Sequence, residues 1–452
     1  MSIHYSFRKV TAHTGSARNF LERYCLAAIA NRGRLGRLDP EFSAALMTYI
    51  ADERNLRLAL EHVEQAGGPS VGVDGLRARD LSRQEQWELI RQTSQQLLAG
   101  TYRRGELLPK QVPKRPGSTQ TRTIHLQTLT DRMVARGVVQ IVQPLLNEKA
   151  DRLSFCRFGR GPQLAIAKAS QLLAQEHRTT WIVEDLANAF DNVPQARLGQ
   201  ILRSQLPNEE VCELALQMVN APSRRGILQG SALSPLLLNV YLDHVIHLPW
   251  QRRFPEVPLL RYVDDLLIAA RPEDAAPELY AELRRLAVAA GFALKRGEAQ
   301  AVSDLSRHEA TWLGYAVGLN EGGVSLRVRS FDACDPAELA ANRAQLLAAF
   351  VRLHARPHSW QYVPAVLQGK LERLAPTFPH VDVRSISQRL VAAAEAAGFD
   401  VLGGAEAQVQ QWESAYRRYQ QMAERIDLRL ADVAPQAMTT GPDEWGPDDV
   451  PF

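Results

Sequence analysis

Two adjacent aspartates, Asp264 and Asp265, lie between apolar runs in LLRYVDDLLIAA, residues 259–270. A tight hairpin would expose both carboxylates at its tip while the apolar residues bury its strands. A third aspartate, Asp185, ends the apolar run of WIVEDLANAF. Carboxylates that meet in space can hold a divalent cation, because hard cations prefer oxygen ligands. Each aspartate also has a structural interpretation, since Asp-Asp is common in solvated turns and Asp185 could cap the following helix.

A segment rich in small residues, GILQGSALSPLLLNVYLD, lies between these two motifs at residues 226–243. Structural interpretations fit each segment separately, but not easily all three in this order. The order and spacing resemble the reverse transcriptases, specifically the bacterial lineage related to group II intron enzymes. The resemblance covers roughly residues 55–330 and includes the blocks VGVDG, VPK, TRTIHL, TDRMVARGVVQIV and WLGY.

The resemblance implies a metal site. In that family, the strand-borne Asp of D-(I/L)-x-x-x-F and the pair in Y-x-D-D form one site on the palm, which implies catalytic and metal-binding roles for Asp185, Asp264 and Asp265. Leu186 is expected at the same metal site. Clustered carboxylates repel one another unless cations neutralise them, and Mg²⁺ is the natural cation, with Mn²⁺ as a substitute. Two ions about 4 Å apart would activate a primer 3′-hydroxyl and neutralise the triphosphate.

Further residues match positions that bind the incoming nucleotide in the family. Phe190 lies where relatives place an aromatic gate under the sugar, and a ring there would exclude a 2′-hydroxyl by steric clash. Its structural alternative is a core phenylalanine on the first turn of a helix. Gln229 matches a glutamine that contacts nucleotide and template. Gly230 would let the backbone approach the substrate closely.

The segment TYRRGELLPKQVPKRPGSTQTRTIHL, residues 101–126, alternates basic and apolar residues around a Gly-Ser-Thr tip. This pattern predicts a basic hairpin. By resemblance, Lys114 and Arg122 would clamp the triphosphate, with Arg suited to bidentate phosphate contact. Alternatively, the hairpin is a solvated face or a general strip that binds nucleic-acid backbone. The residues expected to contact nucleic acid are Arg103, Arg104, Lys110, Arg115, Arg157 and Arg160.

Two places depart from the family pattern. Relatives commonly carry N-x-x-K-T after the catalytic hairpin, where the lysine is a candidate proton donor to the leaving pyrophosphate. Here GFALKRGEAQAV places Glu298 at the expected lysine, and Lys295 or Arg296 is left as a substitute. The usual Y-G-F-R-P-G-R is replaced by FCRFGRGPQLA, so Arg157 and Arg160 are only rough counterparts.

Composition indicates a globular protein with several subdomains. The chain has 452 residues, of which 45% are apolar and 23% charged. No apolar run approaches a membrane span of roughly 18 residues and the N-terminus lacks a signal-peptide pattern, so we expect a cytoplasmic location and no membrane partner. The four cysteines are scattered and suggest neither a metal pair nor a disulfide framework. A net charge of +3 is too small to indicate a nucleic-acid partner by itself.

The pattern of elements together with the resemblance predicts an α+β, right-hand polymerase fold. We expect an N-terminal helical extension at 1–54, fingers and the start of the palm at 55–180, and the palm with the catalytic site at 181–330. A helical thumb or scaffold domain is expected at 331–435 and a disordered acidic tail at 436–452. In addition to the antiparallel palm sheet, helices are predicted around 336–355, 363–375, 383–397 and 405–431.

The expected function is RNA-templated synthesis of DNA by two-metal nucleotidyl transfer. The expected partners are an RNA template, a DNA primer or product and dNTPs, while a non-coding RNA and a second copy of the chain stay open. Stand-alone bacterial relatives without an appended nuclease include groups that act in anti-phage defence, an association that rests on analogy alone. The alternatives are a template-independent terminal transferase, an RNA polymerase on the same palm, or an inactive nucleic-acid-binding scaffold.

Overall fold

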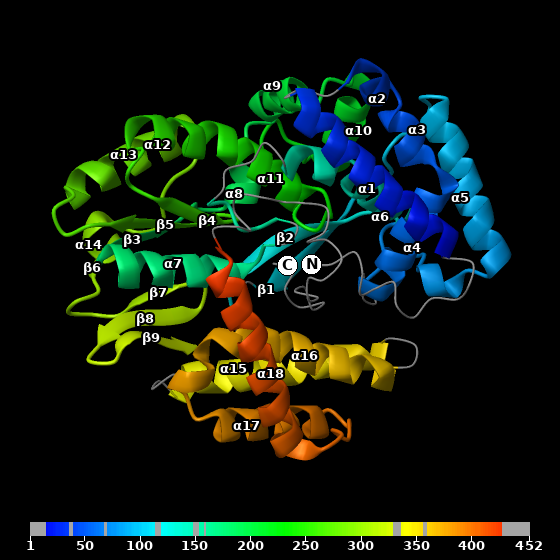
Figure 1. The fold of residues 1–452 in the computed structure, drawn as a ribbon. Coiled ribbons are helices and arrows are strands. Elements are labelled where there is room, and N and C mark those ends of the chain that lie inside the picture. The colour runs from blue at the N-terminus through cyan, green and yellow to red at the C-terminus, as the bar shows by residue number, and fades with distance from the viewer. Residues whose placement is uncertain are drawn as a thin grey trace.

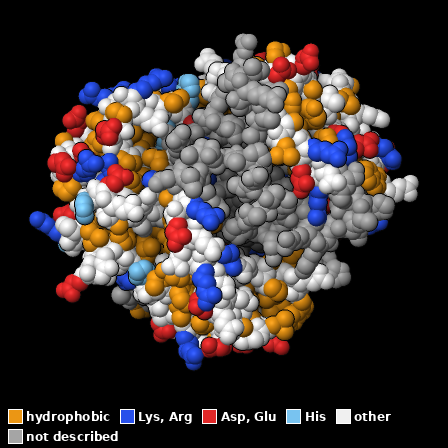
Figure 2. Space-filling model, viewed as in Figure 1, with side chains coloured by type: hydrophobic (Ala, Val, Ile, Leu, Met, Phe, Trp, Pro, Cys, Tyr) orange, Lys and Arg blue, Asp and Glu red, His pale blue; other side chains and the backbone are white. Residues whose placement is uncertain are grey.

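The computed structural model describes residues 15–35, 39–66, 70–113, 119–147, 153–157, 160–328, 336–355 and 359–426. N-terminal helices, a region of antiparallel sheets and a C-terminal group of helices follow one another along the chain (Figure 1). This arrangement confirms the predicted α+β class, antiparallel sheet and helical C-terminal region. Among these residues, no helix combines the length and apolar character needed to cross a membrane. Acidic and basic side chains are interspersed on the face seen in Figure 2.

The N-terminal helices pack around α6 (Leu129–Asn147). The Tyr24 hydroxyl donates a hydrogen bond to Ile141 O of α6 at 2.7 Å. Asn55 Nδ2 donates to Gly137 O at 3.2 Å, and a Cβ on Gly137 would lie 3.2 Å from that nitrogen. Residues before 55 thus share a core with those after it, and the division at 54 stays a prediction. The helices are α1 (Gly15–Leu35), α2 (Pro40–Ala44), α3 (Leu46–Ala51), α4 (Glu53–Ala66), the 3₁₀ turn η2 (Ala78–Asp80) and α5 (Arg83–Leu98).

The VGVDG segment packs against the start of α6. Asp74 Oδ2 accepts a hydrogen bond from Leu129 N at 2.7 Å, which satisfies a donor at the helix N-terminus. A Cβ on Gly72 would lie 2.5 Å from Gln127 O, so only glycine fits this close approach of two backbones. The segment therefore holds the N-terminus of α6 in place.

The predicted basic hairpin is present as the antiparallel pair β1 (Leu108–Pro113) and β2 (Thr121–Leu126). Val112 lies opposite Arg122 in this pair. The hairpin is tied to the rest of the molecule at its base, where Gln127 Nε2 donates to Met218 O at 2.9 Å. Its tip, with Lys114 and Arg115, lies outside the described residues.

The central sheet has the antiparallel order β4-β5-β3-β6. Alternate residues of its strands enter two separate hydrophobic cores. Ile182 and Ile268 face the first core, and Trp181 and Leu267 face the second core. A sheet buried on both faces explains why its strands read as nearly continuous apolar runs. The strands are β3 (Thr180–Asp185), β4 (Leu259–Tyr262), β5 (Asp265–Ala270) and β6 (Val302–Asp304).

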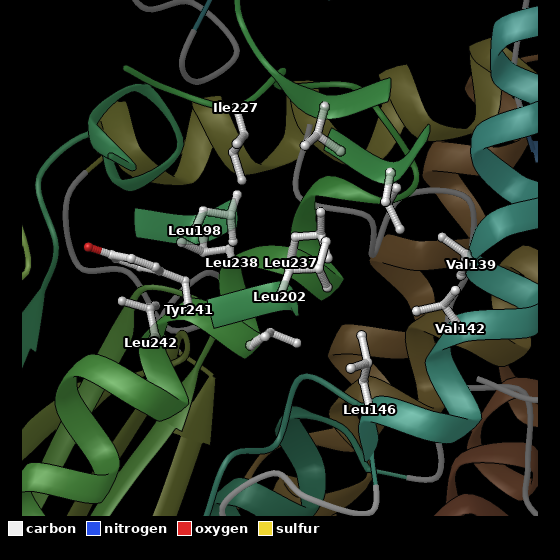
Figure 3. Close-up of a cluster of buried hydrophobic side chains, with 14 of the residues drawn as sticks. Val139, Val142, Leu146, Leu198, Leu202, Ile227, Leu237, Leu238, Tyr241 and Leu242 are labelled. Carbon is white, nitrogen blue, oxygen red and sulfur yellow. The ribbon is translucent and has the colours of Figure 1, made fainter. Parts of the chain in front are cut away.

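Helices around the sheet complete the first core. Figure 3 shows α6 residues such as Val142 near α9 and α11 residues such as Leu202 and Leu238, all of which are fully buried. A π-helical turn, η3 (Asp243–His247), follows α11. The remaining helices of this region are α7 (Pro162–Glu176), α8 (Ala189–Asn192), α9 (Gln195–Gln205), α10 (Glu209–Val219), α11 (Ser234–Leu242), α12 (Leu248–Arg253), α13 (Ala276–Ala289) and α14 (Glu298–Ala301).

A second antiparallel sheet, β7-β8-β9, connects the central sheet to the C-terminal helices. In WLGY, Trp312 lies opposite Tyr315 and the turn residues Leu313 and Gly314 have φ values of 52° and 81°. Trp412 Nε1 donates to Leu374 O at 3.0 Å, which joins two of the C-terminal helices. The strands are β7 (Ala310–Trp312), β8 (Tyr315–Asn320) and β9 (Gly323–Val328).

The C-terminal helices confirm the four predicted ones, up to the last described residue, 426. The predicted acidic tail lies outside the described residues. The helices are α15 (Pro336–Val351), η4 (Arg352–Ala355), η5 (Ser359–Tyr362), α16 (Val363–Leu374), η6 (Ala375–His380), α17 (Val383–Ala396) and α18 (Gly404–Glu424).

Candidate active site

The three aspartates identified in the sequence lie at one end of the central sheet. Asp185, the last residue of β3, is directly opposite Asp265, the first residue of β5. Directly opposed residues of an antiparallel pair project from the same face of a sheet. Leu186 N donates to Asp264 O at 3.2 Å, which ties the hairpin turn to the strand that carries Asp185. The fold therefore brings the three carboxylate-bearing residues together.

The turn that carries Asp264 has an unusual backbone. Tyr262 and Asp265 are paired, so Val263 and Asp264 form a two-residue turn, and Val263 has φ +55°. This left-handed conformation is disfavoured for a β-branched residue. Arg261 stabilises it, because its guanidinium NH1 donates to Val263 O at 3.0 Å.

Arg261 is fully buried, and its guanidinium is paired with Asp243 on η3 at 2.7 Å. It also donates to Asn239 Oδ1 at 2.6 Å and to Ser154 Oγ at 2.9 Å. A buried charge is tolerated when it is paired and hydrogen-bonded. This network lies directly behind the aspartate turn, and sequence reasoning missed it. The available signal was a charged residue, Arg261, inside an otherwise apolar strand.

Electrostatics at the site favour a bound cation. Burial, and after it repulsion from Asp185, raise the pKa of Asp264 to about 6. Burial and then the charges of Asp264 and Asp185 raise the pKa of Asp265 to about 7. The charge of Lys295 opposes both shifts. Additional positive charge at this place would favour the ionised carboxylates.

Lys295 already supplies one positive charge at the site, because its Nζ lies 2.7 Å from Asp185 Oδ1. The contact is an ion pair without hydrogen-bond geometry, and this buried oxygen accepts no hydrogen bond. Of the two substitutes considered for the family lysine, Lys295 is the one at the aspartates. Arg296 instead donates through NH1 to Val183 O at 2.7 Å.

The donor set fits Mg²⁺, although the carboxylates are not arranged as ligands. They offer hard oxygen atoms, and Asp185 Oδ1 lacks a hydrogen bond. However, within the described part of the chain no three His, Cys, Asp or Glu side chains form a group that could hold a metal ion. The expected metal roles of Asp185, Asp264, Asp265 and Leu186 therefore stay predictions, and the ammonium of Lys295 lies 2.7 Å from Asp185 Oδ1.

Glu184 is a further acidic residue that the sequence analysis did not single out. Its side chain is fully buried and accepts hydrogen bonds from Asp185 N at 3.1 Å and Arg296 N at 3.2 Å. Burial raises its pKa. It links β3 to the segment that carries Lys295, and its signal was an acidic residue before the final position of an apolar strand.

Hydrogen bonds connect the segments that carry the residues expected to bind the nucleotide. Ile227 N donates to Phe190 O at 2.8 Å, and Gln229 Nε2 donates to Asp191 Oδ1 at 3.2 Å. Gln229 O in turn accepts from His125 N of β2 at 3.3 Å. The loop around Gln229 thus joins the helix that follows Asp185 to the basic hairpin.

Individual positions within this group differ in exposure. Phe190 is 8% exposed and packs in the first core, which agrees with its structural alternative and leaves the gate a prediction. Gly230 is exposed with φ +111°, a conformation that favours glycine. Arg122 is partly buried, and its Nε has no hydrogen-bond partner. That unsatisfied donor fits an anionic ligand near the hairpin.

Among the residues expected to contact nucleic acid, some are exposed and others are partly or fully buried. Lys110 is exposed on β1. Arg103 is exposed, donates to Gly100 O and Tyr102 O, and lines a pocket of about 530 Å³ that also contains glutamates of α10. Arg104 is partly buried and donates to Gln217 O at 2.7 Å, which ties it to α10.

Arg157 and Arg160 have interior positions that do not suit the expected contact with nucleic acid. Each is 6% exposed. Arg157 pairs with Asp243 at 3.1 Å, and Arg160 donates to Ser154 O at 3.0 Å. Both arginines therefore support the network behind the aspartate turn, which local sequence patterns do not reveal.

Comparisons with known proteins identify part of the chain. The family described as "Reverse transcriptase (RNA-dependent DNA polymerase)" matches residues 112–317. The Pol polyprotein of equine infectious anemia virus (isolate 1369) is 34% identical over 88 residues, which is 19% of this chain and 7% of the polyprotein. The chain thus spans only a small part of that relative.

Solved structures show more distant likeness. The telomerase of Candida albicans, in complex with a fragment of telomeric RNA, has a TM-score of 0.38 at 12% identity, covering 73% of this chain and 65% of that one. A Sicinivirus RNA-dependent RNA polymerase has a TM-score of 0.36 at 13% identity, covering 66% and 64%. The family match contains Asp185, Asp264 and Asp265, and residues 112–317 therefore form a reverse transcriptase domain.

Proposed function

We propose that this chain is an RNA-directed DNA polymerase that uses divalent metal ions held by Asp185, Asp264 and Asp265. The observation that carries the proposal is the register of the central sheet, in which Asp185 lies opposite Asp265. Leu186 N also donates a hydrogen bond to Asp264 O. These contacts lie within the reverse transcriptase match. Bringing three partly buried aspartates to one end of a sheet is unfavourable, because their carboxylates repel one another unless a cation compensates them.

Each residue has a defined part in the proposed reaction. The three carboxylates hold the metal ions, which when bound supply activation of the primer 3′-hydroxyl and neutralisation of the triphosphate. Arg122, with its unsatisfied Nε, binds phosphate oxygens. Phe190 limits the space beside the nucleotide sugar. The buried network around Arg261 keeps the aspartate turn in place.

The connections among the segments that carry Phe190, Gln229 and Arg122 support their proposed contact with the nucleotide. Hydrogen bonds connect the helix of Phe190 through the Gln229 loop to the basic hairpin. A substrate that contacts all three would lie next to Asp185, because α8 begins four residues after it. The polar groups of Gln229 and the positive charge of Arg122 suit a nucleoside triphosphate.

Primer extension tests the proposal. The full chain, an RNA template, an annealed DNA primer and Mg²⁺ should give template-coded incorporation of dNTPs, whereas an Asp264→Ala/Asp265→Ala variant should give none. Incorporation without a template would instead indicate a terminal transferase, and efficient incorporation of ribonucleotides would indicate an RNA polymerase. Nucleic-acid binding without incorporation by the folded wild-type chain would indicate a scaffold and refute the proposal.

The finer expectations of the resemblance are part of the proposal. They comprise a structured or non-coding RNA as template and a role in anti-phage defence. Sequencing the RNA and DNA that co-purify with the chain tests the template, because a defined template should appear as matched RNA and complementary DNA. Random cellular RNA with no complementary DNA would contradict it.

A further inference from the structure

Lys295 is held beside the aspartates by its backbone. Lys295 N donates to Asp185 O at 3.0 Å, and the neighbouring Leu294 forms a β-bridge with Leu186. Its side chain is 50% exposed, and Nζ lies 2.7 Å from Asp185 Oδ1. The backbone is therefore fixed, while the ammonium group has access to solvent.

The arginines near this site are committed to other groups. The Arg296 guanidinium donates to Val183 O, and the fully buried Arg261 is paired with Asp243. Moving either would leave interior polar groups unsatisfied. The ion pair of Lys295 is half exposed, and such pairs are weak enough to exchange.

We infer that Lys295 is a resident counter-cation that a divalent ion displaces when it binds Asp185. The inference rests on the metal-binding carboxylates of the proposed function. The ammonium lies 2.7 Å from Asp185 Oδ1, a buried oxygen that accepts no hydrogen bond, and so lies against the carboxylate that the proposed metal ion uses. The ammonium reduces carboxylate repulsion in the metal-free protein, and this explains why the three carboxylates are close together without a ligand arrangement. Metal binding is therefore an exchange of cations, accompanied by release of the Lys295 side chain.

Amine labelling of the full chain tests the release directly. The protein is treated with an amine-reactive acetyl ester, with and without saturating Mn²⁺, and labelled lysines are quantified by mass spectrometry. Labelling of Lys295 should rise severalfold with Mn²⁺, while that of Lys110, exposed on β1, should not change. An Asp185→Asn variant should show high labelling of Lys295 without metal. Unchanged or reduced labelling of Lys295 in metal-saturated protein would overturn the inference.

Metal affinity provides a second readout that does not depend on catalysis. Lys295→Gln should bind Mn²⁺ roughly threefold or more tightly in calorimetry, because the ion pair between Lys295 and Asp185 no longer has to be broken. Arg307→Gln is the matched control, because Arg307 forms an exposed ion pair with Asp304 on the same sheet. Equal affinity of Lys295→Gln and wild type would overturn the inference.

The two proposals can fail separately. If the wild type binds Mn²⁺ and extends primers but Lys295 labelling does not respond, only the displacement is refuted. If the wild type binds no Mn²⁺ at the aspartates, both the displacement and the metal-dependent function are refuted.

Discussion

Replacing Arg261 should reveal how strongly the interior supports the aspartate turn. In an Arg261→Met variant, Asp243 loses its 2.7 Å partner and keeps Arg157 at 3.1 Å, while Val263 O, Asn239 Oδ1 and Ser154 Oγ each lose a donor. Removing one partner of a buried ion pair costs about 3–5 kcal/mol. We expect a loss of stability in that range, because the remaining Arg157 limits the cost of the buried carboxylate.

Urea unfolding, followed by tryptophan fluorescence, measures this loss as a lower midpoint at unchanged slope. Arg285→Met is the control, since Arg285 forms a surface pair with Glu282 and its loss should change stability far less than the loss of Arg261. Arg261→Lys should also be destabilised, because a lysine cannot reproduce the forked donors. If Arg261→Met lost no more stability than the control, the network would not support the turn.

Three further predictions concern separate parts of the site. Phe190→Val should increase ribonucleotide incorporation at least tenfold relative to dNTPs in single-nucleotide extension, and unchanged sugar selectivity would exclude the gate. Arg122→Gln should raise KM for dNTPs about tenfold or more, consistent with loss of a charged hydrogen bond of about 1.5–3 kcal/mol, and an unchanged KM would place phosphate binding elsewhere. Gly72→Ala should lower the melting temperature by several degrees, because its Cβ would lie 2.5 Å from Gln127 O; an unaltered melting curve would contradict the close packing.

The sequence allowed much of the fold to be predicted because strong local patterns coincide with the elements. Apolar runs on both sides of Asp264 and Asp265 correspond to β4 and β5, and the run before Asp185 corresponds to β3. Helical periodicity likewise located α15 to α18. Their mutual register could not be derived from pattern alone, because each strand is apolar on both faces and offers no alternation to align.

The missed features depend on contacts between residues far apart in the chain. Arg157 was expected to bind nucleic acid, because it is a rough counterpart of an arginine in a family motif. It instead pairs with Asp243 in the interior. No local pattern relates these two positions. The backbone of Val263 was also unpredictable, since a β-branched residue rarely adopts φ +55° and here depends on Arg261 for support.

A crystal structure with Mn²⁺ tests the central claim most directly, because anomalous scattering locates the ion without any assumption about activity. The account predicts an anomalous peak between Asp185 and the hairpin turn, with carboxylate oxygens of Asp185 and Asp264 at about 2.0–2.4 Å from it. It also predicts that the Lys295 ammonium has moved away from Asp185. Fully occupied Mn²⁺ at other sites, with none between these aspartates, would contradict it.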